Sequence, residues 1–281
     1  MRLASLRRRG YPIFPLLISI LMICIPLRAQ DVKASLDQIP HREQILLENL
    51  FSFFIKWEAL GHVLFFETKP VCFTGIPVDC NCSVTPPCIS KEPLKFQEEL
   101  HEGWKIWKKH ELLFAHPNFL ICEEKRQFGK GAKQGTMIDL FFVNKKSFLA
   151  CLNRFCDLFK KELGESFSPE SFLKKVEEKK ILRPLLNHDE LLFGLLLGYG
   201  YEASFAFREE KLGHATDLPA KLVGKRVKGC EFAPVSFKGN PLSEESQALT
   251  NKYSEELTTI WNSYRGKNLL EVTLEKLCAS S

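Results

Sequence analysis

Apolar residues recur every three or four positions along much of the chain, the spacing that places them on one face of an α-helix. The first such run follows Pro40, includes Leu50, Phe54 and Trp57, and ends at Gly61. The same spacing predicts further helices near residues 93–114, 145–163, 169–180, 190–211 and 244–264, and a short last helix ending near residue 278. Most of the chain is therefore expected to be helical.

Strand patterns occupy two regions between these helices. Residues 62–66 and 71–73 are rich in β-branched and aromatic side chains, with a break at 68–70. Residues 118–124 and 137–143 form the clearest pair of strands. The glycine- and lysine-containing segment between them, 127–136, lacks the spacing and the following helix of a phosphate-binding loop. We interpret it as a flexible hairpin tip.

Together these elements predict an α+β fold. A small antiparallel sheet, near residues 62–73 and 118–143, is expected to pack against about six helices in one compact domain over residues 30–281. Residues 213–242 contain seven glycines and prolines. We expect an irregular arm there, with one short strand at 232–237.

The most apolar stretch after the N-terminus is residues 191–201, which hold no charge. Eleven residues are too few to cross about 30 Å of hydrocarbon, so the stretch predicts a buried helix. Gly194 and Gly198 are four residues apart and would leave a groove where another backbone approaches closely. Glu202 follows directly, and its charge, if buried, would need Arg183 or Arg208 as a partner.

The N-terminus has the three parts of a secretory signal peptide. Arg2 and residues 7–9 are basic, residues 11–27 are uncharged, and Pro26 precedes the small residue Ala29. We expect cleavage after Ala29, so that residues 1–29 are removed and the remainder is exported to the periplasm, the cell envelope or the medium.

Two alternatives to cleavage after Ala29 remain. Residues 11–27 are at the lower limit of a membrane span, so the segment could be an uncleaved signal anchor in the inner membrane. The basic cluster would still direct residues 31–281 outward, with membrane contact only through the N-terminal segment. Cys24 follows an apolar run, as the lipid-modified cysteine of a lipoprotein does. However, the preceding Ile23 is bulky where such sites have small residues.

Removal of the signal peptide would also remove the excess of positive charge. The chain has 39 basic and 34 acidic residues, and five arginines lie in residues 1–29, which have no acidic residue. Residues 30–281 therefore hold 34 of each sign. A balanced domain has no overall field to attract phosphate backbones, so we expect no nucleic-acid partner.

Export also changes the interpretation of the cysteines, because disulfides persist outside the cytosol. Nine of the ten cysteines follow the signal segment, so at least one has no intramolecular partner. Cys80, Cys82 and Cys88 lie in a polar, proline-containing loop that needs a staple to be ordered. We expect Cys88 to pair with Cys80 or Cys82, and the third thiol to reach Cys72 or Cys122. Free or redox-active thiols and a metal site are the alternatives, although the spacing lacks the paired ligands of a zinc site.

No established catalytic motif is present in the sequence. A thiol nucleophile would require Cys72 or Cys122 beside a histidine such as His62, His116 or His188. His188 also has a structural role available at a helix start. No catalytic, cofactor-binding or metal-ligating residue is therefore assigned, and no cofactor is expected.

Several segments carry a resemblance to a known group. WEALGHVLF at 57–65, TKPVCF at 68–73 and LLFGLLLGYG at 191–200, with Glu202, Ala203 and Phe207, resemble uncharacterised exported proteins of chlamydia-type intracellular bacteria. The similarity covers roughly residues 45–210. The resemblance implies export and a host-associated origin, and it implies no activity, ligand or catalytic residue.

Two classes of function are consistent with these observations. The first is a non-enzymatic exported binding protein at the envelope or host interface, which contacts a protein partner of unknown identity through aromatic side chains. The second is an exported hydrolase, thiol-dependent or of another type. A single reactive thiol beside a histidine would favour the enzyme.

The processing of the N-terminus is directly testable. Because Ala29 follows a short apolar segment and a helix-breaking proline, the exported protein should begin near Gln30. Intact-mass spectrometry of exported material should show the loss of residues 1–29. Recovery of the full-length chain in a membrane fraction would instead identify a signal anchor.

Overall fold

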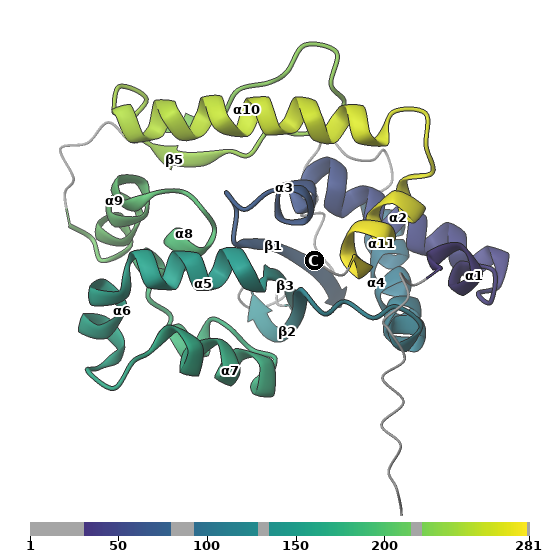
Figure 1. Ribbon diagram of the computed structural model, residues 1–281, viewed down its shortest axis with the longest axis horizontal. Coiled ribbons are helices and arrows are strands. Elements are labelled where there is room, and N and C mark those ends of the chain that lie inside the picture. Colours follow the sequence, from purple (N-terminus) through teal and green to yellow (C-terminus); the bar gives the residue numbers. More distant parts are fainter. Residues whose placement is uncertain (1–30, 80–92, 129–134, 215–220, 280–281) are drawn as a thin grey trace, which may run out of the picture.

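The computed structural model describes residues 31–79, 93–128, 135–214 and 221–279 (Figure 1). The α+β class is confirmed, with eleven helices and five strands in this part of the chain. The helices are α1 (Val32–Leu36), α2 (His41–Trp57), α3 (Leu60–Phe65), α4 (Pro93–His110), α5 (Lys145–Arg154), α6 (Cys156–Leu163), α7 (Pro169–Lys179), α8 (Glu190–Leu196), α9 (Tyr201–Lys211), α10 (Glu244–Tyr264) and α11 (Leu269–Cys278).

The main sheet is antiparallel and has three strands. Its order is β1 (Val71–Asp79), β3 (Gly135–Asn144) and β2 (Phe119–Phe128), so β3 is the central strand. The predicted strand pair is thus confirmed, and β2 and β3 form a hairpin whose tip, residues 129–134, lies outside the described residues. In the arm, β4 (Lys221–Val223) pairs with β5 (Phe237–Gly239), which starts where the predicted strand was expected to end.

The central strand separates two apolar cores because successive side chains of a strand point to opposite faces. Leu140 and Phe142 contribute to a core with α2, α4, α10 and α11, whereas Phe141 and Val143 contribute to a core with α5, α7 and α8. Figure 1 shows these two groups of helices on opposite sides of the sheet. Burial on both faces explains why β3 is almost continuously apolar.

The prediction of a strand at residues 62–66 is wrong, because this segment is helix α3. Helix α2 ends at Trp57, and Ala59 takes a left-handed conformation (φ 60°) that starts the new helix. Gly61 lies inside α3 instead of ending α2, and a Cβ there would be 2.8 Å from Ile260 of α10. A short apolar run that is buried on all sides has no period by which strand and helix can be distinguished.

The single helix expected over residues 190–211 is two helices. Helix α8 ends at Leu196, and the chain turns at Gly198 and Gly200, which have φ of 80° and 81°. Helix α9 then folds back onto α8. The predicted close approach at Gly194 is confirmed, because a Cβ on this residue would lie 2.5 Å from Oγ of Ser204 on α9.

Polar residues cap the helices that position the later part of the chain. The side chains of Ser168, Asp189 and Ser243 accept backbone hydrogen bonds at the starts of α7, α8 and α10. Helix α10 lies along one side of the molecule, next to α3 and β5 (Figure 1). It contributes Leu257, Ile260 and Tyr264 to the core with α2, α4 and α11, and Tyr253 to a small cluster with Val223 and Phe237 of the arm.

The contact between α8 and α9 provides a stability test. Gly194→Ala should destabilise the fold by roughly 1–3 kcal/mol, because the new methyl group overlaps Ser204. The cost should fall when Ser204 is changed to Gly, which a double-mutant cycle of urea unfolding would measure. An equal cost in both backgrounds would contradict the contact.

Candidate functional site

The cysteines that the sequence singles out divide into two groups. Cys80, Cys82 and Cys88 lie outside the described residues, so their pairing stays a prediction. Cys72 on β1 and Cys122 on β2 are buried, and the structure shows both as free thiols. Free thiols are also found at Cys151, Cys156, Cys230 and Cys278.

The buried thiols are poorly suited to nucleophilic chemistry. Burial raises the pKa of Cys72 well above its usual range, and its Sγ donates a hydrogen bond to the carbonyl of Glu58 at 2.9 Å. Burial likewise raises the pKa of Cys122 and of Cys151 to about 12. The thiolate is the reactive form, so these residues are protonated and inert at neutral pH.

The predicted histidine partners also lie elsewhere. Nδ1 of His62 contacts Glu256, and Nδ1 of His116 contacts the carbonyl of Phe119. His188 is exposed beside the N-cap Asp189. No cluster of three metal-ligating side chains is found among the described residues.

Glu202 is exposed, so the concern about a buried charge at this position is wrong. Its two expected partners pair with other carboxylates. Arg183 contacts Glu190 at 2.6 Å, and Arg208 contacts Glu162 at 3.2 Å.

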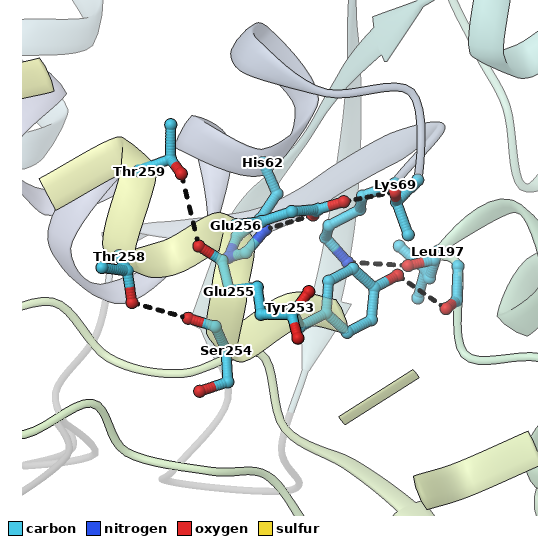
Figure 2. Close-up of polar contacts among 11 residues, drawn as sticks. His62, Lys69, Leu197, Tyr253, Ser254, Glu255, Glu256, Thr258 and Thr259 are labelled. Carbon is cyan, nitrogen blue, oxygen red and sulfur yellow. Dashed lines mark hydrogen bonds and ion pairs between the residues drawn. The ribbon is translucent and has the colours of Figure 1, made fainter. Parts of the chain in front are cut away.

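A buried polar network that the sequence analysis missed lies between α3, α10 and the chain before β1 (Figure 2). Nδ1 of His62 is 2.9 Å from a carboxylate oxygen of Glu256, and the hydroxyl of Thr68 donates to the other oxygen. Burial lowers the pKa of His62, although the bond to Glu256 opposes this effect. His62 is also in edge contact with the ring of Tyr253.

The turn after α8 joins this network through two backbone carbonyls. The ammonium of Lys69 donates to the carbonyl of Leu197 at 2.7 Å, and the hydroxyl of Tyr253 donates to the carbonyl of Gly198 at 2.7 Å (Figure 2). The Lys69 ammonium also lies 4.9 Å from the ring centroid of Tyr199. A lysine that is only 3% exposed is thus fixed by a carbonyl and an aromatic face.

Lys69 borders a cavity of about 490 Å³. The arm closes one side of it, and the backbone N–H of Ala233 attaches the arm to the end of α2 by donating to the carbonyl of Lys56 at 2.6 Å. Two apolar side chains with high exposure line the cavity, Trp57 at 38% and Leu222 at 75%. The lining residues are Trp57, Glu58, Ala59, Lys69, Phe73, Tyr199, Leu222, Gly224, Arg226 and residues 233–236.

The ionisable groups of this cavity have shifted pKa values. Burial lowers the pKa of Lys69 to about 8, against the attraction of Cys72 and Glu58. Burial raises the pKa of Glu58 to about 7, partly offset by the charge of Lys69. Burial also raises the pKa of Tyr199 to about 12. At about pH 6, below both pKa values, the cavity therefore holds a charged lysine and a largely neutral glutamic acid.

The charges at the cavity favour an anion. Neither Lys69 nor the exposed Arg226 has a carboxylate within ion-pair distance in the part of the chain that the structure describes. Aromatic walls and a few convergent polar groups are typical of small-molecule sites. The arrangement can bind an anionic group at Lys69 and a flat apolar group against Trp57, Phe73 or Tyr199.

This site is not apparent from the sequence because its residues come from several distant segments of the chain. The sequence of residues 68–70 predicts a polar break between strands, because a lysine beside a proline is typical of an exposed turn. Burial of Lys69 depends on Leu197 and Tyr199, which lie more than one hundred residues later. Two charged residues, Glu67 and Lys69, between apolar segments are the one signal in the sequence.

Comparison with protein-family models gives no match, and searches of curated proteins and of solved structures find no significantly similar chain. None of the helices in the described residues has both the length and the apolar character that a membrane crossing requires.

Burial of Lys69 predicts a specific dependence of stability on pH. The unfolded chain binds a proton at Lys69 up to about pH 10.5, whereas the folded protein releases it near pH 8. The free energy of unfolding should therefore rise between these values, by on the order of 3 kcal/mol relative to Lys69→Met. Urea unfolding of both proteins at several pH values measures this difference.

The control for this experiment is Lys105→Met, since Lys105 is exposed on α4. Its stability should follow that of the unmodified protein at every pH. If the free energy of unfolding changes with pH in the same way in the unmodified protein and in Lys69→Met, folding does not lower the pKa of Lys69.

Proposed function

We propose that this chain is an exported, non-enzymatic binding protein, and that the cavity at Lys69 is its site for a small anionic ligand. The observation that carries the proposal is Lys69, a residue that is 3% exposed, lines a cavity of about 490 Å³ and has no carboxylate within ion-pair distance among the described residues.

The energetic argument concerns the cost of burying a charge. An ammonium loses several kcal/mol of hydration on transfer to the interior unless hydrogen bonds or an opposite charge compensate. The carbonyl of Leu197, the ring of Tyr199 and the attraction of Glu58 when it is ionised compensate in part, as the lowered pKa of Lys69 indicates. An anion in the cavity would supply the missing charge.

Binding is better supported than catalysis. Burial raises the pKa of five thiols, those of Cys72, Cys122, Cys151, Cys230 and Cys278. This disfavours the alternative function, a thiol-dependent hydrolase. A thiol-dependent hydrolase also needs a histidine in contact with its nucleophile, whereas Nδ1 of His62 contacts Glu256 and its Nε2 has no hydrogen-bond partner among the described residues. A single reactive thiol found by labelling the native protein would favour the hydrolase again.

A protein partner held by a broad aromatic surface is less well supported. Among the large apolar residues with high exposure, the aromatic ones are Trp57 and Tyr201 in the described part of the chain. Trp57 belongs to the cavity. Exposed apolar side chains at the border of a cavity fit a ligand better than a flat interface.

Export is supported by the features of residues 1–29 and by the resemblance to exported chlamydial proteins. The cavity would then be available to ligands of the periplasm, the envelope or the medium. The balanced charge of residues 30–281 supports a small anion in place of nucleic acid.

The proposal predicts binding of 2-naphthoate, a flat aromatic carboxylate. Binding should be at least tenfold tighter at pH 6 than at pH 9, because Lys69 loses its proton near pH 8 and Glu58 becomes negative near pH 7. Lys69→Met should weaken binding roughly tenfold or more at pH 6, the cost of losing a charged hydrogen bond. Isothermal titration calorimetry gives both values.

Two controls accompany this measurement. Lys105→Met removes an exposed lysine far from the cavity lining and should leave binding unchanged. Naphthalene-2-methanol has the same ring system without the charge and should bind weakly at both pH values. If naphthoate and the alcohol bind equally, or if Lys69→Met binds naphthoate as the unmodified protein does, the proposed site is wrong.

A further inference from the structure

A second cavity, of about 400 Å³, adjoins the first. The two cavities share four lining residues, Phe73, Tyr199, Leu222 and Ser236. We call the first the Lys69 cavity and the second the Phe207 cavity. Apart from the shared residues, the Phe207 cavity is lined by Arg183, Glu190, Phe193, Gly194, Leu197, Ala203, Ser204, Phe207, Lys211, Phe237 and Lys238.

Two of the three cationic side chains of the Phe207 cavity are paired with carboxylates, and the third, Lys211, is exposed. Arg183 contacts Glu190 at 2.6 Å, and its guanidinium also lies over the ring of Phe193. Lys238 contacts Glu210 at 2.7 Å. The ammonium of Lys211 lies over the ring of Phe207. The surface left for a ligand is mainly aromatic and aliphatic, in contrast to the Lys69 cavity.

We infer that the two cavities together bind a single-chain anionic amphiphile, with its head group at Lys69 and its hydrocarbon chain in the Phe207 cavity. This inference rests on the proposed function and specifies its ligand class. Charge complementarity assigns the head group to Lys69, because this residue is 3% exposed, borders the Lys69 cavity and has no carboxylate within ion-pair distance among the described residues. Lys211 also lacks such a carboxylate but is exposed, and Arg183 and Lys238 are paired, so the Phe207 cavity is left for the apolar part.

The shared residues lie where such a ligand would pass from one cavity to the other. Phe73 and Tyr199 offer ring surfaces to both cavities, and Leu222 is 75% exposed although it is apolar. A hydrocarbon chain laid against Leu222 would remove that side chain from water. The two volumes fall in the range of cavities that enclose small organic ligands.

The test is a series of straight-chain carboxylates from acetate to dodecanoate, each used below its micelle concentration at pH 6. Affinity should rise about three- to fourfold for each methylene group that enters the Phe207 cavity. Dodecyltrimethylammonium, which has the same chain and the opposite charge, should bind at least tenfold more weakly than dodecanoate. Calorimetry with the full protein measures each dissociation constant.

A pair of variants separates the Phe207 cavity from the rest of the molecule. Phe207→Asp places a carboxylate in that cavity and should reduce dodecanoate affinity at least tenfold, without changing the affinity for 2-naphthoate. Leu212→Asp is the matched control, because Leu212 follows α9, is 61% exposed and lines neither cavity. It should leave both affinities unchanged.

The outcomes distinguish this inference from the proposed function. Binding of naphthoate with no increase along the carboxylate series would overturn the amphiphile inference and leave the anion site in place. Failure of every anion to bind would overturn both. Equal affinity for dodecanoate and dodecyltrimethylammonium would also overturn the inference. Tighter binding of dodecanoate than of dodecyl phosphate would identify a free fatty acid, and the reverse a phosphorylated lipid, and either result supports the inference.

Discussion

The turn after α8 is the point on which the arrangement of the molecule depends. Gly198 has a left-handed backbone and has no room for a side chain, since a Cβ would lie 2.4 Å from the hydroxyl of Tyr253. The turn therefore presents two neighbouring carbonyls, of Leu197 and Gly198, to Lys69 and Tyr253. These bonds connect α8 to the chain before β1 and to α10, and so they join the two cores beside the cavity.

Helix α10 is held by this turn at one position and by His62 at another. Glu256 accepts one hydrogen bond from the hydroxyl of Thr68 and contacts Nδ1 of His62. One buried carboxylate on α10 therefore binds both α3 and the chain leading to β1. Tyr253, one turn earlier on α10, contacts Gly198. A buried network of this kind stabilises one arrangement of its elements only when its polar groups find partners together. Lys69, which lines the cavity, directly follows Thr68 of this network, so the network also fixes the backbone at the cavity border.

The sequence predicts the helices with regular apolar spacing and clear caps, and it predicts the hairpin of β2 and β3. Ser168 and Ser243 mark helix starts because a local side-chain bond determines them. Helix α3 was mistaken for a strand because a fully buried run has no polar face to reveal its period. The candidate site was missed for a different reason. Lys69 is unremarkable in sequence, and its burial is produced by contacts with residues that no local pattern connects to it.

The edges of the main sheet have a consequence for how two copies of the chain could meet. β2 is an edge strand, and its backbone could pair with a second chain and seed aggregation. The segment after α7 covers this edge in part, because the N–H of Glu123 donates to the carbonyl of Lys180 and the carboxylate of Glu124 accepts from the N–H of Leu182. Further along, Lys125 and Arg126 place charge on the strand. A sheet whose edge is covered and charged in this way offers little free backbone to a second chain.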